Sequence, residues 1–221
     1  MLTSAMGAES TDEHAAETGE ASPAGPAATE SGGAVLIPVK AFNQAKGRLT
    51  PALTPSDRAS LAQRMATHVV TAQGGTPVAI ACDDEGVAEW ARSLDARVIW
   101  CPGTDLNGAI EAGYRELATA GHTSIAIAHS DLPRAPALGP LLTWSGVTIV
   151  PDRHRAGTNV MVLPPGLDMR FGYGANSYPH HVNEAVRHRR GLRIVHDQDL
   201  GWDVDYPDDL DESILLPKDP A

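Results

Sequence analysis

Short apolar runs alternate along this chain with segments in which apolar residues recur at helical spacing. The runs are rich in Val, Ile and Ala and occupy residues 35–39, 78–81, 98–100, 124–128 and 147–150. Runs of this kind are typical of strands that are covered on both faces. Leu61, Met65 and Val69 are spaced as on one face of a helix, and similar patterns follow over 87–94 and 106–117. The alternation predicts a series of βαβ units.

The helix predicted after the first run has a clear start. Thr54 supplies an N-cap hydroxyl, Pro55 stands at the first helical position, and Asp57 lies in the first turn, near the positive end of the helix dipole. βαβ units form parallel sheets with right-handed crossovers, and such sheets bind ligands at the carboxyl ends of their strands. We therefore expect an α/β fold with a mostly parallel central sheet and functional residues where its strands end.

The pattern weakens after residue 150. Residues 159–163 and 192–195 are predicted strands, and residues 207–216 a short closing helix. The stretch 164–178 contains several Gly and two Pro and predicts an irregular loop. Long irregular loops in compact domains are usually functional, so this loop is a candidate part of the site.

Composition and charge divide the chain in two. The 221 residues carry a formal net charge of −11, and residues 1–33 contain acidic residues but no Lys, Arg or aromatic residue. Such a segment cannot bury enough apolar surface to offset its ordering entropy, which predicts a disordered acidic tail over 1–33. The remainder is long enough for one domain, which we place at residues 34–216. The acidic balance argues against nucleic-acid binding, which requires clustered basic residues.

The sequence also predicts the cellular location of the protein and the role of its two cysteines. The chain has no secretory-type leader and no run of about 18 apolar residues, so we expect a cytoplasmic protein without a membrane span. Cys82 and Cys101 are the only cysteines and lack a Cys-x-x-Cys spacing. We expect two small buried side chains rather than a zinc site or a disulfide.

The loop after the first predicted strand is basic. Lys40, Lys46 and Arg48 follow one another within nine residues, and Gly47 between them permits close backbone approach. At the carboxyl end of a strand these cations would neutralise phosphate charge, which makes them candidate catalytic residues. The other interpretation is a solvated basic loop. The sequence has neither a P-loop nor a dinucleotide-binding glycine fingerprint.

Carboxylates follow the fourth apolar run and recur near the end of the chain. Asp131 comes directly after the run 124–128, and Asp203 and Asp205 stand two residues apart, so that on an extended segment both face one side. One Asp after a strand is more often a turn former than a ligand. Three convergent carboxylates would repel one another without a cation, so the set predicts a divalent metal site.

Three further segments carry polar groups suited to an anionic substrate. After the fifth run, Arg153 and Thr158 offer a cation and a hydroxyl, although a charged hairpin connection would look the same. Gly174 and Ser177 belong to a glycine-rich segment able to form an anion-binding nest. Asn107 either caps a helix or reaches a nucleobase edge. The adjacent His180 and His181 are expected in surface or capping roles.

Taken together, these segments resemble the 2-phospho-L-lactate or phosphoenolpyruvate guanylyltransferase family, which makes the phosphodiester-linked intermediate of coenzyme F-420. The resemblance covers about residues 34–212 and depends on five segments in order rather than on any one. These segments are Ile37–Lys40 with Lys46 and Arg48, Ser130–Pro133, Asp152–His154 with Gly157–Asn159, Phe171–Ser177, and Asp203–Asp205 with Asp208–Leu210.

The resemblance implies a single Rossmann-like domain of the nucleotide-diphospho-sugar transferase type. It implies GTP as donor, attack of the acceptor phosphate on the α-phosphorus with release of pyrophosphate, and two Mg²⁺ held chiefly by Asp131 and Asp203. Thr158, Gly174 and Ser177 would bind the acceptor, with Gly172 as the alternative to Gly174.

Several alternatives stay open at this level. Phosphoenolpyruvate is the expected acceptor and 2-phospho-L-lactate the alternative. A cytidylyl- or molybdopterin-type nucleotidyltransferase on the same fold, or a binding module without turnover, would carry similar residues. A downstream enzyme of the pathway is a possible partner, and the sequence does not fix the oligomeric state.

Overall fold

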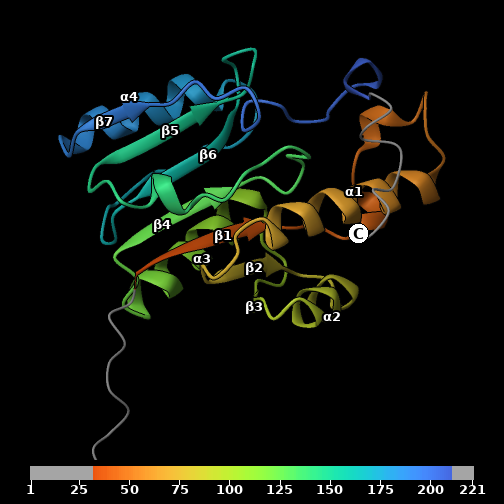
Figure 1. The fold of residues 1–221 in the computed structure, drawn as a ribbon, viewed down its shortest axis with the longest axis horizontal. Coiled ribbons are helices and arrows are strands. Elements are labelled where there is room, and N and C mark those ends of the chain that lie inside the picture. The colour runs from red at the N-terminus through yellow and green to blue at the C-terminus, as the bar shows by residue number, and fades with distance from the viewer. Residues whose placement is uncertain (1–31, 211–221) are drawn as a thin grey trace, which may run out of the picture. The chain divides into compact units, whose positions relative to one another are not determined.

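The computed structural model describes residues 32–210, which form a seven-stranded sheet with helices packed on both faces (Figure 1). Most strands are short, and five of the seven are buried at every residue or at all but the first, as their apolar runs predict; the two edge strands are partly exposed. In chain order the strands are β1 (Gly33–Pro38), β2 (Val78–Cys82), β3 (Arg97–Trp100), β4 (Ser124–Ala128), β5 (Val147–Pro151), β6 (Thr158–Leu163) and β7 (Leu192–Ile194). Each of the seven predicted strands is present, with ends shifted by two residues at most.

The strand order is β3-β2-β1-β4-β6-β5-β7. β6 runs antiparallel to β4 and to β5, whereas the other paired strands are parallel. The predicted mostly parallel sheet is thus confirmed. Because β6 is reversed, its first residue lies at the edge where β4 and β5 end. This reversal brings the start of β6 to the edge where a parallel sheet binds its ligands.

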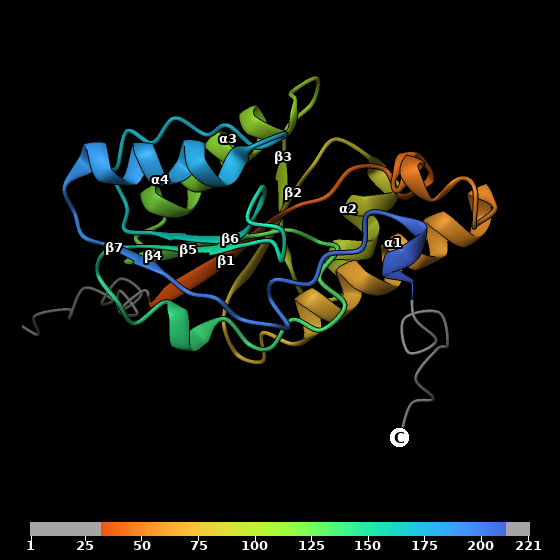
Figure 2. The same ribbon diagram turned by 90° about the horizontal axis from the view of Figure 1, so that it is seen from above.

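Four helices cover the sheet. They are α1 (Pro55–Thr71), α2 (Glu85–Ser93), α3 (Leu106–Thr119) and α4 (Ser177–His188). Apolar residues of α1 and α2 pack with Val35 and Ile37 of β1, whereas those of α3 and α4 belong to a second cluster with Leu36. Successive strand residues face opposite sides of a sheet, so the clusters mark two faces. Figure 2 shows α3 and α4 together on one of them.

Side-chain caps fix where three of the helices begin. Thr54 accepts a hydrogen bond from the backbone N–H of Asp57 at 3.2 Å, with Pro55 as the first helical residue, as predicted. Asp84 caps α2 through the N–H of Val87 at 2.9 Å. Asp105 caps α3 through the N–H of Gly108 at 2.8 Å. The cap of α3 is therefore Asp105, and the capping alternative for Asn107 is wrong.

The last described segment closes against α1. Val204, with Trp202 and Leu210, packs onto Leu61 and Met65 of that helix. The predicted closing helix begins at Pro207, but within the described residues it is a single 3₁₀ turn, Pro207–Asp209, after which Leu210 is extended. Residues 211–216 lie outside the described part. Leu49 and Leu53, from the connection that leads into α1, belong to the same cluster, so the packing attaches the last described segment to that connection as well.

Two other predictions concern the ends and the cysteines. Most of the predicted tail, residues 1–31, also lies outside the described residues, while Gly33 already belongs to β1. Cys82 and Cys101 are free and buried, as expected. Within residues 32–210 no helix is both long and apolar enough to span a bilayer.

Candidate active site

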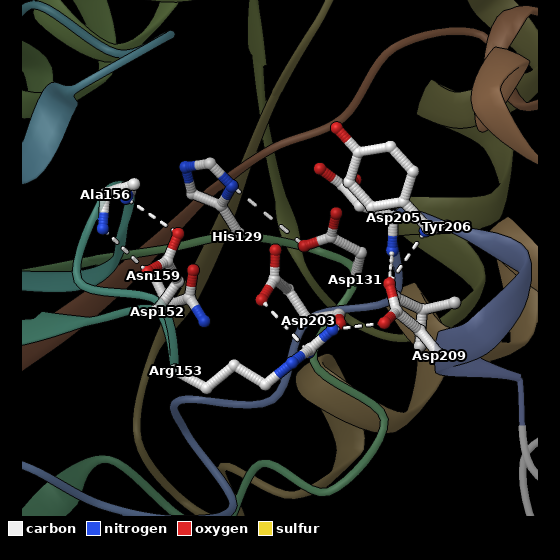
Figure 3. Close-up of polar contacts among 12 residues, drawn as sticks. His129, Asp131, Asp152, Arg153, Ala156, Asn159, Asp203, Asp205, Tyr206 and Asp209 are labelled. Atoms are coloured by element: carbon white, nitrogen blue, oxygen red, sulfur yellow. Dashed lines mark hydrogen bonds and ion pairs between the residues drawn. The ribbon is translucent and has the colours of Figure 1, made fainter.

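A cleft of about 580 Å³ opens at the edge of the sheet where β4 and β5 end and β6 begins. The loop after β4, the β5–β6 connection, the start of α4 and the segment 203–209 line it. Figure 3 shows the acidic part of this cleft, with Asp131 and Asp203 between His129 and Arg153. The structure therefore brings together residues from four segments that are far apart in the sequence.

Lys46 lies at the centre of the acidic cluster. Its ammonium donates a hydrogen bond to Asp131, another to the carbonyl of Val204 at 2.6 Å, and approaches Asp205 Oδ1 at 3.4 Å. Its side chain is 9% exposed. Its backbone has a φ of 56°, in the left-handed region that non-glycine residues seldom adopt, and the three contacts hold it there.

In this cluster the opposite charges of Lys46 and Asp131 each stabilise the charged form of the other. Burial alone would lower the pKa of Lys46, but Asp131 and Asp205 outweigh burial and raise it. Burial alone would raise the pKa of Asp131, but Lys46 and His129 outweigh burial and lower it. Lys46 is therefore an ammonium and Asp131 a carboxylate at neutral pH.

The other two predicted cations are more exposed. Arg48 donates to Asp205 Oδ2 at 2.6 Å, and its side chain is 62% exposed. Lys40 is exposed and forms no ion pair with any described residue. Both lie at the rim of a second cleft of about 340 Å³, which Asp131 and Asp205 also line. The basic loop thus faces an open surface that joins the first cleft at these two carboxylates.

The carboxylates leave donor atoms for a hard cation. Asp131 Oδ1 is buried and has no hydrogen-bond partner among the described residues, because His129 Nδ1 is 3.9 Å away. The pKa of Asp203 is raised, first by burial and then by the negative charges of Asp131 and Asp205. Both oxygens of Asp205 face cations. Oxygen-rich sites with adjacent carboxylates suit Mg²⁺.

The described residues contain no preformed group of three His, Cys, Asp or Glu side chains that could hold a metal by themselves. The predicted three-carboxylate metal site of Asp131, Asp203 and Asp205 is therefore not found as a preformed group. Mg²⁺ is commonly bound by one or two carboxylates and completed by water and substrate phosphates. Asp131 and Asp203 are the pair that fits this description best. The predicted metal-binding role of Asp205 stays a prediction.

Arg153 is anchored rather than free. It forms an ion pair with the buried Asp209, donates to the carbonyl of Asp203 at 2.8 Å, and lies 4.4 Å from the ring centre of Trp202. Asp209 in turn accepts from the backbone N–H groups of Asp205 at 2.8 Å and Tyr206 at 2.7 Å (Figure 3). The pair therefore fixes the backbone that carries Asp203 and Asp205.

The loop between β5 and β6 wraps around one carboxylate. Asp152 accepts from the backbone N–H of Ala156 at 2.9 Å and from that of Gly157 at 2.7 Å. A Cβ on Gly157 would lie 2.8 Å from Asp152 Oδ2, so a glycine is needed there. This tight loop delivers Thr158, the first residue of β6, to the wall of the cleft.

Thr158 and Ser177 lie together on that wall. The backbone N–H of Thr158 donates to Ser177 Oγ at 3.0 Å, and Thr158 Oγ1 contacts His181 Nδ1 at 3.0 Å. Ser177 is the first residue of α4, whose N-terminus faces the cleft. A helix N-terminus favours an anion. The structure thus brings the two predicted acceptor-binding hydroxyls side by side.

The glycine loop before α4 resolves one ambiguity. Gly174 lines the cleft with a φ of +138°, a conformation that favours glycine. Gly172 does not line it; a Cβ there would lie 2.5 Å from His180, so packing accounts for that glycine. Asn107 accepts from the N–H of Tyr173 at 2.7 Å and donates to its carbonyl at 3.3 Å, which anchors the same loop.

Four residues of the site were given no site role in the prediction. His129 and Asp152 line the cleft, Asp209 holds Arg153, and His181 is fully buried, contrary to the surface role expected for it. One signal was available for His181. It shares with Ser177, Glu184 and Ala185 the spacing of one helix face.

The sequence is similar to those of known guanylyltransferases. Residues 33–220 match the family model described as guanylyl transferase CofC like. The chain is 32% identical over 186 residues to a phosphoenolpyruvate guanylyltransferase from Sphaerobacter thermophilus, covering 80% of this chain and 90% of the relative. It is 34% identical over 190 residues to a 2-phospho-L-lactate guanylyltransferase from Methanothermobacter thermautotrophicus, covering 81% of this chain and 83% of that one.

A solved structure supports the fold. The chain superposes on a nucleotide-diphospho-sugar transferase-like protein from Desulfovibrio desulfuricans with a TM-score of 0.66 at 17% identity, covering 79% of this chain and 82% of that one. This similarity concerns the fold alone. The family match over residues 33–220 shows that the chain belongs to the CofC-like guanylyl transferase family.

Proposed function

We propose that this protein transfers GMP from GTP to the phosphate of phosphoenolpyruvate and releases pyrophosphate. One observation carries the proposal beyond family membership: two clefts with different linings meet at Asp131 and Asp205. A transferase needs such an arrangement, because donor and acceptor must reach the same point from different sides. The pathway expected from the sequence, coenzyme F-420 biosynthesis, belongs to the proposal.

The cleft lined by the basic loop suits the donor. Lys40, Lys46 and Arg48 line it together with Gly47, and a triphosphate there would meet three cations. A smaller adjoining hollow of about 220 Å³ also includes Lys40 and extends to the ends of β2 and β3. The two hollows together offer room for a nucleotide whose phosphates point toward Asp131.

The other cleft suits a small anionic acceptor. Thr158, Gly174 and Ser177 lie on its wall, next to the N-terminus of α4. The Ser177 oxygen accepts from the N–H of Thr158 and its hydroxyl donates to no described residue, so the Ser177 proton is available to a ligand. The Thr158 hydroxyl bonds Nδ1 of His181, and the tautomer of that ring sets the direction of the bond. Phosphoenolpyruvate carries a carboxylate and a phosphate, and both are acceptors for such donors.

The chemistry requires neutralisation of charge more than proton transfer. The acceptor phosphate is ionised near neutral pH, so its oxygen attacks the α-phosphorus without a general base. The two anions repel each other, and Lys46 and Arg48 offset that repulsion from fixed positions. Asp131 and Asp203 would hold Mg²⁺, which when bound neutralises phosphate charge and orients the substrates. The proposal includes two ions, with Asp205 as the third carboxylate nearby.

One experiment tests the reaction and the acceptor together. Purified protein is incubated with GTP, Mg²⁺ and either phosphoenolpyruvate or 2-phospho-L-lactate, and products are identified by mass. We expect the guanylylated phosphoenolpyruvate and one pyrophosphate per product. Preferential use of phospholactate would favour the alternative acceptor, as in the Methanothermobacter relative. Faster turnover with CTP would replace the guanylyl proposal, and ligand binding without product or Mg²⁺ dependence would indicate a binding module.

A variant tests the assignment of Asp131. Asp131→Asn should lower turnover by roughly 100-fold or more, because it removes charge at the point where the clefts meet. Glu116→Gln is the matched control, since Glu116 pairs only with Arg97 on the exposed side of α3. Unfolding curves of both variants show whether loss of activity reflects loss of fold. Near-normal pyrophosphate release by Asp131→Asn would refute the metal assignment.

A further inference from the structure

His181 is a fully buried imidazole beside the acceptor cleft. It lies on the inner face of α4, one turn after Ser177, and has no exposed surface. Its ring lies 4.5 Å from that of Tyr173. A polar ring buried this completely must satisfy both of its nitrogens.

Each ring nitrogen has one partner, and the first fixes the tautomer. The backbone N–H of Gly172 points at His181 Nε2 at 3.2 Å. A backbone N–H only donates, so Nε2 accepts and carries no hydrogen. In a neutral imidazole the proton is then on Nδ1, which lies 3.0 Å from Thr158 Oγ1. Nδ1 therefore donates to the threonine hydroxyl.

The imidazole is neutral under ordinary conditions. The pKa of His181 is lowered to about 4, chiefly by burial and also by the nearby His180 and His129, while Glu184 opposes them. A neutral ring agrees with the hydrogen bond from Gly172, since an imidazolium would place two donors face to face. The tautomer argument thus applies near neutral pH.

The protonated Nδ1 of His181 determines how the Thr158 hydroxyl is oriented. Because Oγ1 already accepts from His181, its own proton must be directed elsewhere. The neighbouring Ser177 Oγ already accepts from the N–H of Thr158. Of the residues the structure describes, none accepts the Thr158 proton, and Thr158 lines the cleft.

We propose that His181 is a positioning residue that fixes the Thr158 hydroxyl as a hydrogen-bond donor toward the anionic acceptor. The inference rests on the proposed function, because it assigns the acceptor to the cleft that Thr158 lines. His181 does not touch the substrate. It acts through Thr158, and through Gly172 it also holds the loop that carries Gly174.

A spectroscopic measurement tests the tautomer without any substrate. Long-range ¹H–¹⁵N spectra of the imidazoles at neutral pH should show one histidine with a protonated Nδ1 and an unprotonated Nε2, and its signals should disappear in His181→Asn. A ring protonated on Nε2, or on both nitrogens, would overturn the proposal. This outcome does not depend on whether the protein is a guanylyltransferase.

Kinetics test the action through Thr158. Thr158→Val and His181→Leu should each raise the KM for the acceptor about 10- to 100-fold, as expected for a lost hydrogen bond to a charged group, with the KM for GTP little changed. The double variant should be no worse than the poorer single variant, because both changes remove one function. His181→Asn, which places an amide N–H near Nδ1, should recover part of the loss.

A matched control separates positioning from general damage. His196→Leu makes the same change at an exposed histidine that does not line the cleft, and should leave the KM for the acceptor unchanged. A folded His181→Leu variant with wild-type KM for the acceptor, or additive effects in the double variant, would overturn the proposal. Absence of product from the wild-type protein with every acceptor would instead overturn the proposed function.

Discussion

Lys46 and Asp131, 85 positions apart in the sequence, form an ion pair that joins the loop after β1 to the loop after β4. The same ammonium donates to the carbonyl of Val204, so a third segment is attached at this point. Adjacent parallel strands end at the same edge of a sheet, and β1 and β4 are adjacent. The pair therefore connects the predicted donor side of the site to its predicted metal side.

Replacing Lys46 by Met should destabilise the fold by about 3 kcal/mol at pH 7, because it leaves the largely buried Asp131 carboxylate without its partner. Urea unfolding measures this difference. Lys40→Met is the control: Lys40 is exposed and has no ion pair with a described residue, so its replacement should change stability by less than about 0.5 kcal/mol.

Adding Asp131→Asn to Lys46→Met should recover part of the stability, since no unpaired charge then remains. A Lys46→Met protein as stable as wild type would show that the ion pair does not hold the three segments together.

Asp209 is expected to matter more to stability than its neighbour Asp208. Asp209→Ala removes the acceptor of two backbone N–H groups and the partner of Arg153, and should lower the free energy of unfolding by about 3 kcal/mol. Asp208 is exposed on the same turn, so Asp208→Ala should cost less than about 0.5 kcal/mol. Equal losses in the two variants, measured by urea unfolding, would contradict this account.

Much of the fold was predictable because local signals and tertiary packing agree. The strand at residues 124–128 was predicted at its observed ends, since a run buried on both faces has a composition that loops lack. α4 was missed because it follows an irregular glycine loop, and because its N-cap residue, Asn176, has a left-handed backbone and makes no side-chain capping bond. Its buried face, Ser177, His181, Glu184 and Ala185, is mostly polar, so the usual apolar helical pattern is weak there.

The candidate site could be predicted from the sequence only for residues whose type strongly suggests one role, such as carboxylates that bind a metal. Asp131 was indicated by its place after a buried strand, and Asp203 by its spacing to Asp205 on an extended segment; the structure places Asp131 and Asp203 in one cleft. Sequence does not reveal which polar atoms are already satisfied. From the sequence, the Asn107 amide was a candidate contact to a nucleobase edge. In the structure its oxygen and its nitrogen both bond the backbone of Tyr173. The partner of a side chain is a property of the fold.

Gly157 should be intolerant of any side chain. Gly157→Ala places a Cβ against the Asp152 carboxylate, which is held by two backbone N–H groups, so the loop must shift. We expect a loss of about 1–3 kcal/mol and a raised KM for the acceptor, because Thr158 follows directly. Gly75→Ala, at a glycine with open space around its Cβ position, is the control. Equal unfolding curves and equal KM values would refute the role of this loop.

The buried His181 should make stability depend on pH between about 6.5 and 4. Its pKa is about 4 in the folded protein against an ordinary value of 6.5, so in this range the unfolded chain binds more protons and stability falls as pH falls. A shift of this size corresponds to a contribution of roughly 3 kcal/mol that is present above pH 6.5 and lost as pH approaches 4.

The variant His181→Leu lacks this contribution, whereas other titrating groups act equally in both proteins and cancel. The difference in unfolding free energy between wild type and His181→Leu should therefore shrink by about 3 kcal/mol from pH 7 to pH 4, measured by urea unfolding at several pH values. Parallel curves for the two proteins would mean that His181 is not held neutral by burial, and the fixed donor at Thr158 would lose its physical basis.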